Sequence, residues 1–513
     1  MTSQTDLKPA TSSRAQPTTT TTSVLIIGSG FSGLGLAAKL DDAGITDWLL
    51  LEHADRVGGT WRDNTYPGCE CDIPSPLYSF SFDQNPDWSR LFAPQPEILN
   101  YLESFAQRQG LLDRIRFGRK VLRAGWDEDC QKWIVTTASG GERYVADHLV
   151  SAVGLLHRPN TPDIAGLDDF SGEVFHSAQW NHDYDLAGKR VAVIGTGASA
   201  IQFVPAIVDR AASLHLFQRS APWILPKVNH AFTEEDRRKL RRFPWLKWYR
   251  RTKLYWQHEE RAEGFTNVAA DNQKTVQYAR RHLERQVADP ELRAKLTPDY
   301  ALGCKRLLIS GDYYPALTQP HVDLVTEGIR EITEESIVTS SGEQVDVDCI
   351  IFGTGFDAQD ALREVTITGR QGTLAEAWEN GMSAYLGTTV PRFPNFFILC
   401  GPNTGLGHNS QVFMIERQAR YTIAAVKAAR RRGPIEVKES AQRSFRDWLK
   451  QQMANTVWTA GGCTSWYLDP KSGENTLLWP STTIDFWKKT FRLRPSDYTF
   501  TRRHSSTGPA EVR

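Results

Sequence analysis

The sequence predicts an α/β protein with two doubly wound, Rossmann-like units and a helical insertion in the second unit. This prediction depends on two glycine motifs, each of which directly follows a run of apolar residues. The first motif is G-x-G-x-x-G at Gly28, Gly30 and Gly33, and the second is G-x-G-x-x-A at Gly195, Gly197 and Ala200. The first glycine of such a motif permits a tight turn, the second lets the backbone approach a pyrophosphate, and the third small residue lets the following helix pack closely. Both units are therefore predicted to bind a dinucleotide.

The first unit has all of its parts between residues 24 and 52. Residues 24–27 predict a buried strand, residues 33–43 a helix whose N–H groups point at the phosphates, and residues 48–51 a second strand. Glu52 follows that strand, where a carboxylate accepts hydrogen bonds from a ribose hydroxyl. Ser29 and Phe31 fill variable positions of the glycine motif and are assigned to the same binding site.

The stretch GGTWRDNTYPGCECD, residues 58–72, follows this unit. Its glycines, including Gly59, permit close approach to a ligand, and Trp61 and Tyr66 can lie against a flat heterocycle. We interpret the stretch as a flavin contact, although a glycine-rich loop with core aromatics has the same composition. Asp72 is either a turn cap or a residue that orients a cation.

The second unit differs from the first at the end of its second strand. Residues 189–194 predict the first strand, and Thr196, Ala198 and Ser199 complete the glycine motif at the start of the next helix. Where an acidic residue would recognise a free 2'-hydroxyl, the chain has Gln218 and Arg219, followed by Ser220. A guanidinium matches a 2'-phosphate, so NADPH is favoured over NADH.

Composition restricts the partners and the compartment. Lysine plus arginine and aspartate plus glutamate both total 60, so the overall charge does not indicate nucleic acid. Seven scattered cysteines favour a reducing compartment over a disulfide framework, and Cys69-x-Cys71 lacks the C-x-x-C spacing of a dithiol oxidoreductase. Residues 1–22 are interpreted as a disordered tail, and no apolar run approaches the ~18 residues of a membrane span. We expect a soluble cytoplasmic protein with no metal site.

Residues 231–299 interrupt the second unit with charged, helix-forming sequence. Residues 237–253 carry nine lysines or arginines interleaved with aromatic residues, a pattern found in membrane-surface helices and nucleic-acid patches. Pro244 breaks the segment and acidic residues flank it, so we favour a solvated helical insert.

Several motifs together resemble a known family. They are the GGTWxxxxYPGxxxD stretch, the segment F-x-G-x-x-x-H-x-x-x-W at Phe170, Gly172, His176 and Trp180 between the two glycine motifs, and DCIIFGTGFD at 348–357. With CKRLLISGDYYPAL at 304–317, these motifs resemble the Baeyer–Villiger monooxygenases, within the wider class of flavin-containing monooxygenases. FPNFFILCGPNTGLGHNS at 393–410 and CTSWYLDPKSGENTLLWP at 463–480 are most similar to the 4-hydroxyacetophenone monooxygenase branch. One position departs from the family pattern, because Asn181 stands where Pro or Asp usually follows the tryptophan.

The resemblance implies a domain organisation and a reaction. FAD is expected to bind residues 23–160 and 386–513, with Tyr78 among its contacts, and NADPH to bind residues 161–230 and 300–385, with Lys305 and Trp466. NADPH would reduce the flavin, O2 would give a C4a-peroxyflavin, and this would convert a ketone to an ester or lactone. The resemblance places the active-site arginine on Arg306 and its orienting carboxylate on Asp72, and it implies that the insert covers the active site.

Three other functions compete with this interpretation. A flavin-containing monooxygenase of the heteroatom type would oxidise sulfur or nitrogen atoms. A disulfide reductase would need a redox-active cysteine pair beside the flavin, and none has that spacing. A non-catalytic flavin-binding protein would hold FAD that NADPH fails to reduce. The particular ketone and the oligomeric state cannot be inferred from the sequence.

Overall fold

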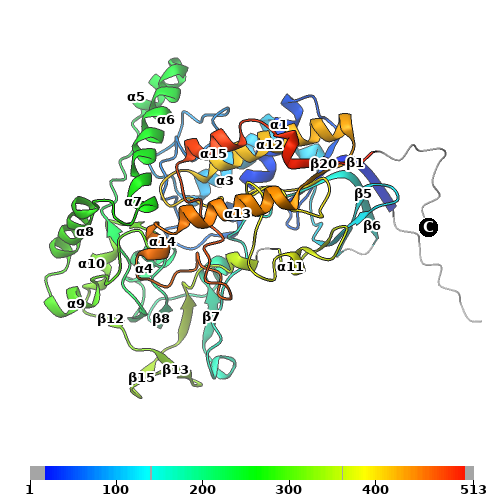
Figure 1. Cartoon of the computed structure of the whole chain (residues 1–513). Helices are drawn as coiled ribbons and strands as arrows, with labels where there is room; N and C mark the ends of the chain where they lie inside the picture. Colours follow the sequence, from blue (N-terminus) through cyan, green and yellow to red (C-terminus); the bar gives the residue numbers. More distant parts are fainter. Residues whose placement is uncertain (1–17, 139–140, 361, 503–513) are drawn as a thin grey trace, which may run out of the picture.

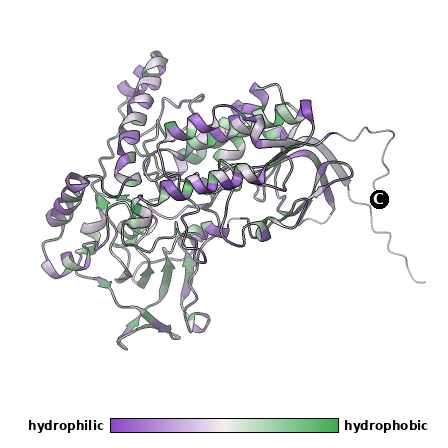
Figure 2. Cartoon of the chain, viewed as in Figure 1, coloured by the Kyte–Doolittle hydropathy of each residue, from purple (hydrophilic) through white to green (hydrophobic). Residues whose placement is uncertain are grey.

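The computed structural model describes residues 18–138, 141–360 and 362–502, and in these ranges two mainly parallel sheets organise the chain (Figure 1). The predicted α/β class with two doubly wound units is confirmed. None of the helices in these ranges is long and apolar enough to cross a membrane. Figure 2 shows hydrophobic residues on the strands of the second sheet, whereas the outer helices α5 (Glu234–Arg242) and α8 (Gln273–Gln286) are mainly hydrophilic.

The first sheet has eight strands in the order β17-β4-β5-β6-β1-β2-β3, with β18 also paired to β6. Its strands are β1 (Thr18–Ile27), β2 (Trp48–Leu51), β3 (Ile115–Arg116), β4 (Val121–Asp127), β5 (Lys132–Thr137), β6 (Glu142–Ser151), β17 (Thr366–Thr368) and β18 (Phe396–Ile398). The central strands β1, β2 and β6 are parallel and almost wholly buried in their second halves, because apolar residues fill both faces.

The structure corrects two boundaries that we expected in this sheet. Residues 1–17 lie outside the described part, but Thr18–Thr22, assigned to a disordered tail, pair in parallel with Glu142–Ala146. Threonine is β-branched and suits a strand even where it is exposed. Thr366–Thr368 pairs with β4, so the chain returns to the first sheet before residue 386, where we had expected the return.

Three helices pack on this sheet: α1 (Phe31–Asp42), α3 (Gln95–Arg108) and α12 (Gln411–Arg432). The long helix α12 packs against α1 and against α15 (Thr483–Thr490), so the last hundred residues complete the first unit (Figure 1). Two further helices from this part of the chain are α13 (Glu439–Met453) and α14 (Val457–Ala460), and the strands β19 (Ile435–Val437) and β20 (Tyr498–Phe500) pair antiparallel.

The second sheet has five parallel strands in the order β12-β9-β8-β16-β7. They are β7 (Glu173–His176), β8 (Arg190–Ile194), β9 (Ser213–Phe217), β12 (Val322–Val325) and β16 (Cys349–Phe352). Helices α4 (Ala200–Ile207) and α10 (Tyr313–Leu317) pack beside it. A three-stranded sheet of β13 (Ile329–Ile332), β14 (Ser336–Thr339) and β15 (Gln344–Asp346) extends this unit.

The predicted helical insert is confirmed, and its helices lie between Glu234 and Lys295. Its helices are α5, α6 (Pro244–Glu259), α7 (Glu263–Thr266), α8 and α9 (Pro290–Lys295). Pro244 begins α6, because a proline at the first helical position needs no N–H partner. Around the insert, β10 (Ile224–Leu225) pairs with β11 (Leu308–Ile309), which directly follows Lys305 and Arg306. The remaining short helices are α2 (Thr60–Asp63) and α11 (Leu374–Ala377).

Candidate functional site

The first glycine motif forms a turn between β1 and α1 that leaves room for a ligand. Gly28 has φ of 101°, and a Cβ there would lie 2.8 Å from the Ala152 carbonyl oxygen, so only glycine fits. A Cβ on Gly33 would lie against the Gly28 carbonyl oxygen, which explains the third glycine. At Gly30 the nearest neighbour of a Cβ is the Gly59 Cα at 3.7 Å. The open space at Gly30 faces the start of α1, where helical N–H groups favour an anion.

Glu52 lies beside this turn, and its carboxylate is already bonded by the chain. It accepts hydrogen bonds from the Ser29 N–H at 2.9 Å and hydroxyl at 2.6 Å, from the Ala54 N–H at 3.0 Å, and it pairs with Arg62 at 3.0 Å. Burial acts to raise the pKa of Glu52, but the bonds from His53, Ser29 and Ala54 outweigh burial and lower that pKa. Glu52 is therefore a permanent carboxylate that also fixes the glycine turn, a role that spacing alone did not reveal.

The aromatic residues assigned to the flavin separate into two groups. Phe31, Trp61 and Tyr78 pack together, with the Trp61 Nε1 donating to the Tyr78 hydroxyl at 3.2 Å. Tyr66 instead reaches the second unit, where its hydroxyl donates to Gln202 Oε1 at 2.9 Å and its ring contacts Phe203. The residues of GGTWRDNTYPGCECD thus line the first glycine turn at one end and the junction of the two units at the other.

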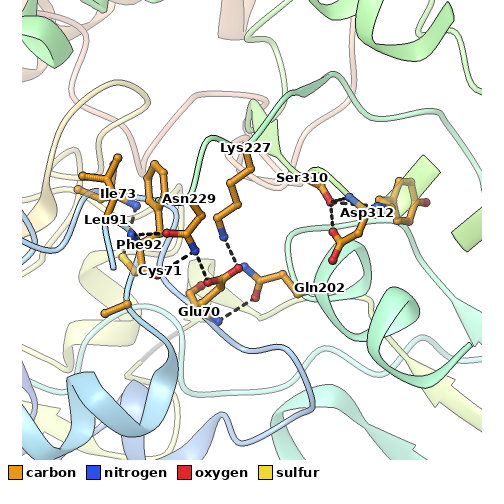
Figure 3. Close-up of polar contacts among 12 residues, drawn as sticks. Glu70, Cys71, Ile73, Leu91, Phe92, Gln202, Lys227, Asn229, Ser310 and Asp312 are labelled. Atoms are coloured by element: carbon orange, nitrogen blue, oxygen red, sulfur yellow. Dashed lines mark hydrogen bonds and ion pairs between the residues drawn. The ribbon is translucent and has the colours of Figure 1, made fainter. Parts of the chain in front are cut away.

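A polar network holds the two units together at this junction (Figure 3). Gln202 in α4 donates to the Glu70 carbonyl at 2.9 Å, and the Glu70 side chain pairs with the buried Lys227 ammonium and accepts from Asn229 at 3.0 Å. Asn229 also accepts from the Phe92 N–H at 3.0 Å. Because residues 70 and 92 belong to the first unit and residues 202–229 to the second, this network fixes their relative position at the loop that carries Asp72.

The second glycine motif repeats the geometry of the first. Gly195 has φ of 109° and a Cβ there would lie 2.6 Å from the Gly353 carbonyl oxygen, whereas a Cβ on Gly197 would meet that oxygen only at 3.6 Å. Thr196, Ala198 and Ser199 complete the turn, and Ala200 begins α4 and is fully buried. The open position at Gly197 again faces a helix start.

Two cations lie where the second strand of this unit ends. Thr196 donates to the Ser220 carbonyl at 3.2 Å, and Lys305 donates to the Ser220 hydroxyl at 2.6 Å. Burial, and after it the charge of Arg219, lowers the pKa of Lys305. Arg219 is exposed and forms no ion pair within the described part of the chain. Two cations beside a glycine turn have the chemistry to bind a phosphate.

The segment F-x-G-x-x-x-H-x-x-x-W contains β7, which is an edge strand of the second sheet. Phe170 and Gly172 lead into β7, which ends at His176, and a Cβ on Gly172 would lie 2.5 Å from the Asp348 carbonyl oxygen. Burial lowers the pKa of His176, whose Nδ1 accepts from the Ala178 N–H at 3.0 Å. The Trp180 ring packs on Phe203 of α4. These residues therefore connect the edge strand to the helix that follows the second glycine motif.

Asn181, the departure from the family pattern, is a structural part of that edge. Its Nδ2 donates to the Glu173 carboxylate at 2.7 Å, and its Oδ1 accepts from the Asp183 N–H at 3.1 Å. The asparagine thus ties the end of the segment to the start of β7.

Arg306 and Asp72, separated by 234 residues, form an ion pair. The Arg306 Nη2 lies 2.6 Å from Asp72 Oδ2, its Nε donates to the same oxygen at 2.8 Å, and its Nη1 donates to the Leu406 carbonyl at 3.4 Å. The Asp72 charge raises the pKa of Arg306, so the guanidinium stays protonated. Since 32% of the Arg306 side chain remains accessible, the cation can still contact a small molecule.

Trp466 and Tyr467 belong to the loop beside this pair. Burial raises the pKa of Tyr467 to about 12, with the charge of Arg306 opposing the shift. Trp466 is 45% exposed and packs against Tyr467 with the two rings tilted by 48°. Gln359 donates to the carbonyl groups of both residues. Sequence reasoning assigned Trp466 to the coenzyme but missed the contribution of Leu406 and Tyr467 to the surroundings of Arg306, because no local pattern marks them.

A disulfide joins the two segments that carry these residues, contrary to our expectation from cysteine spacing. Cys304 precedes Lys305 and Cys463 lies in the loop of Trp466, and their Cα atoms are 6.1 Å apart. Their sequence separation of 159 made the pairing unpredictable from local spacing. Cys69 and Cys71 are free and buried, and burial raises the pKa of Cys69 to about 12, so neither is a reactive thiolate.

The chain matches known flavoproteins over most of its length. Residues 21–245 match the family model of flavin-binding monooxygenase-like proteins. A Baeyer–Villiger monooxygenase of Pseudomonas aeruginosa is 49% identical over 93% of this chain and 91% of that protein, and one of Streptomyces coelicolor is 46% identical over 95% and 94%. The crystal structure of cyclohexanone monooxygenase from a Rhodococcus species, bound to NADP+, superimposes with a TM-score of 0.83 at 30% identity, covering 92% of this chain and 97% of that one. With these relatives, two dinucleotide-type turns and the Arg306–Asp72 pair, this chain belongs to the Baeyer–Villiger monooxygenase family of flavin-dependent enzymes.

Proposed function

We propose that the chain uses FAD, NADPH and O2 to convert ketones to esters or lactones, with Arg306 at the reacting centre. The observation that carries this proposal is the partly accessible Arg306–Asp72 ion pair in a chain that has two dinucleotide-type turns. Bound FAD supplies the chemistry, since it is reduced by NADPH and delivers one oxygen atom from O2 to the substrate. The chain supplies charge, orientation and exclusion of water.

Arg306 would stabilise negative charge that develops on the reacting oxygens and on the ketone carbonyl oxygen. A guanidinium suits this role because it stays protonated and presents a planar set of donors. The Asp72 carboxylate accepts a hydrogen bond from Nε of Arg306 and pairs with its Nη2. The Leu406 carbonyl accepts a hydrogen bond from Nη1. These contacts hold the guanidinium in one orientation, so that little reorganisation accompanies the reaction.

The residues at the two glycine turns fit the two cofactors. We assign FAD to the turn at Gly28, Ser29, Gly30, Phe31 and Gly33, together with Glu52, Gly59, Trp61, Tyr66, Asp72 and Tyr78. We assign NADPH to Gly195, Thr196, Gly197, Ala198, Ser199 and Ala200, together with Arg219, Ser220, Lys305 and Trp466. The open space at Gly30 and Gly197, each facing a helix start, supports these assignments.

Arg219→Ala should weaken NADPH binding much more than NADH binding. Arg219 and Lys305 lie together beside Ser220, and a charge-assisted bond to a 2'-phosphate contributes ~1.5–3 kcal/mol. We expect roughly a tenfold to hundredfold rise in the Kd for NADPH. Isothermal titration calorimetry with each coenzyme measures the two Kd values. The control variant is Arg210→Ala, which removes an exposed arginine that pairs with Asp185. Equal losses for NADPH and NADH would exclude Arg219 from the phosphate site.

We propose that the substrate class follows the 4-hydroxyacetophenone monooxygenase branch, because the two segments that resemble this branch both reach Arg306. Leu406 lies in one segment, and Tyr467 with Cys463 lies in the other. Mass spectrometry of products from aryl, cyclic, linear and steroid ketones tests this proposal. A sulfide assayed in parallel separates ketone oxidation from heteroatom oxidation, and conversion of the sulfide alone would contradict the proposed function.

Cys463→Ser should increase the release of hydrogen peroxide per NADPH consumed. The disulfide ties the segment of Lys305 and Arg306 to the loop of Trp466 and Tyr467, so its loss lets that loop move and admits water. Ester yield and peroxide, measured together, give the coupling ratio. Cys130→Ser removes an exposed free cysteine and should leave the ratio unchanged. An unchanged ratio in Cys463→Ser would show that the disulfide does not position the loop.

We further propose a cytoplasmic location. The five free cysteines among the described residues support a reducing compartment, whereas the Cys304–Cys463 disulfide does not.

A further inference from the structure

The hairpin of α5 and α6 carries a set of aromatic side chains that face solvent. Phe243 at the turn is 41% exposed, and along α6 Trp245, Trp248, Tyr249 and Trp256 are 63%, 68%, 55% and 49% exposed. Single exposed aromatics are common, but five on one hairpin form a patch of the kind that binds a partner. Figure 1 shows α5 and α6 projecting from one corner of the molecule, so this patch, which we call the aromatic ridge, stands clear of the two dinucleotide units.

The aromatic ridge is not needed to hold α6 on the protein. The other side of the helix is anchored by Arg251, which is buried and donates to the carbonyl groups of Pro76, Leu77 and Ser79. Further along, the Glu259 carboxylate accepts from Asn409 at 2.8 Å and from Thr483 at 2.7 Å. Trp245, Tyr249 and Trp256 recur at a spacing of four and seven residues, which places them along one side of a helix. The exposed side therefore presents several aromatic rings on an anchored helix.

The sequence around the ridge carries more basic than acidic residues. Residues 237–258 contain nine lysines or arginines and no aspartate or glutamate. Four of these cations pair with the acidic residues in the first turn of α5. Arg238, Arg242 and Lys253 are exposed and form no ion pair in the part of the chain that the structure describes. Tryptophan and tyrosine combined with unpaired cations is the composition that favours the headgroup region of a bilayer.

We propose that the aromatic ridge docks on the surface of an anionic lipid bilayer. The aromatic rings would enter the headgroup layer, and Arg238, Arg242 and Lys253 would bind lipid phosphates. A second copy of the chain suits the ridge poorly, because a two-fold interface would place this basic surface against itself. Binding would be peripheral, in agreement with the absence of a membrane-spanning helix among the described residues.

The test is flotation of the FAD-loaded enzyme with lipid vesicles. Wild-type enzyme should float with vesicles of phosphatidylcholine and phosphatidylglycerol, and much less with phosphatidylcholine alone or in high salt. Trp245→Ala/Trp248→Ala should lower the bound fraction, and Arg238→Gln/Arg242→Gln/Lys253→Gln should weaken binding at least roughly tenfold. The control Trp487→Ala/Lys488→Gln changes an exposed pair on α15 and should bind as wild type. FAD content and circular dichroism establish that each variant is folded.

Three outcomes would overturn the proposal. In the first, the wild-type enzyme fails to bind anionic vesicles, or the α15 control loses binding as strongly as the ridge variants. In the second, sedimentation shows a dimer that the tryptophan variant abolishes, so that the ridge is an interface between copies. In the third, a DNA duplex binds the ridge as tightly as the vesicles do, so that the basic surface recognises phosphate backbones in general.

Discussion

Arg306→Ala should nearly abolish ester formation while leaving the protein able to bind FAD and to be reduced by NADPH. The guanidinium is held by Asp72 and Leu406, whereas other residues form the two glycine turns. Removing one group that stabilises developing negative charge typically costs 10²- to 10³-fold in rate, and we expect a loss of roughly that size in ester formation. Electrons from NADPH should appear as hydrogen peroxide instead.

Two measurements on one preparation separate the reduction of the flavin by NADPH from the oxygenation of the substrate. Stopped-flow absorbance follows flavin reduction by NADPH, and product analysis gives ester and peroxide. Arg306→Lys keeps the charge but loses the planar set of donors. Its rate of ester formation should therefore lie between the rates of the wild type and of Arg306→Ala. Asp72→Asn should also form ester at an intermediate rate, because this variant loses the ion pair that orients the guanidinium but keeps the guanidinium itself. Ester formation at the wild-type rate in Arg306→Ala would exclude this residue from the mechanism.

Local sequence pattern predicted the elements that surround the dinucleotide turns. The strand expected at residues 48–51 is β2, and the helix expected at residues 33–43 is α1. These elements follow from apolar runs and glycine spacing, which act over a few residues. The two glycine turns were predictable for the same reason, since their conformation excludes side chains at Gly28 and Gly195.

Contacts between distant segments could not be predicted from such patterns. The Arg306–Asp72 pair came from the family resemblance, because neither residue stands in a motif that specifies a partner 234 positions away. The Cys304–Cys463 disulfide and the Glu70–Lys227 pair were missed, since they depend on how the second unit packs against the first. The early start of β1 was missed because a run of threonines has the composition of a disordered tail, and its pairing with β6 is decided across the sheet.

Gly30→Val should yield a folded chain that no longer retains FAD. Gly30 has φ of −79° and ψ of −165°, which any residue adopts, and a Cβ there meets only the Gly59 Cα at 3.7 Å. The substitution therefore costs the chain itself little, whereas the added methyl groups occupy the space that we assign to the pyrophosphate. We expect FAD affinity to fall at least roughly tenfold, about 1.4 kcal/mol or more. The ratio of the visible flavin absorbance to the absorbance at 280 nm gives the FAD content of the purified protein.

Two control variants distinguish ligand exclusion from damage to the fold. Gly125 in β4 also has open space around its Cβ, so Gly125→Val should keep FAD. Gly33→Ala should destabilise the chain even without FAD, because its Cβ would collide with the Gly28 carbonyl. Adding FAD should raise the Tm of the wild type and of Gly125→Val, since a ligand that binds the native state stabilises it, but should leave the Tm of Gly30→Val unchanged. A Gly30→Val protein that purifies with a full complement of FAD would show that the pyrophosphate lies elsewhere.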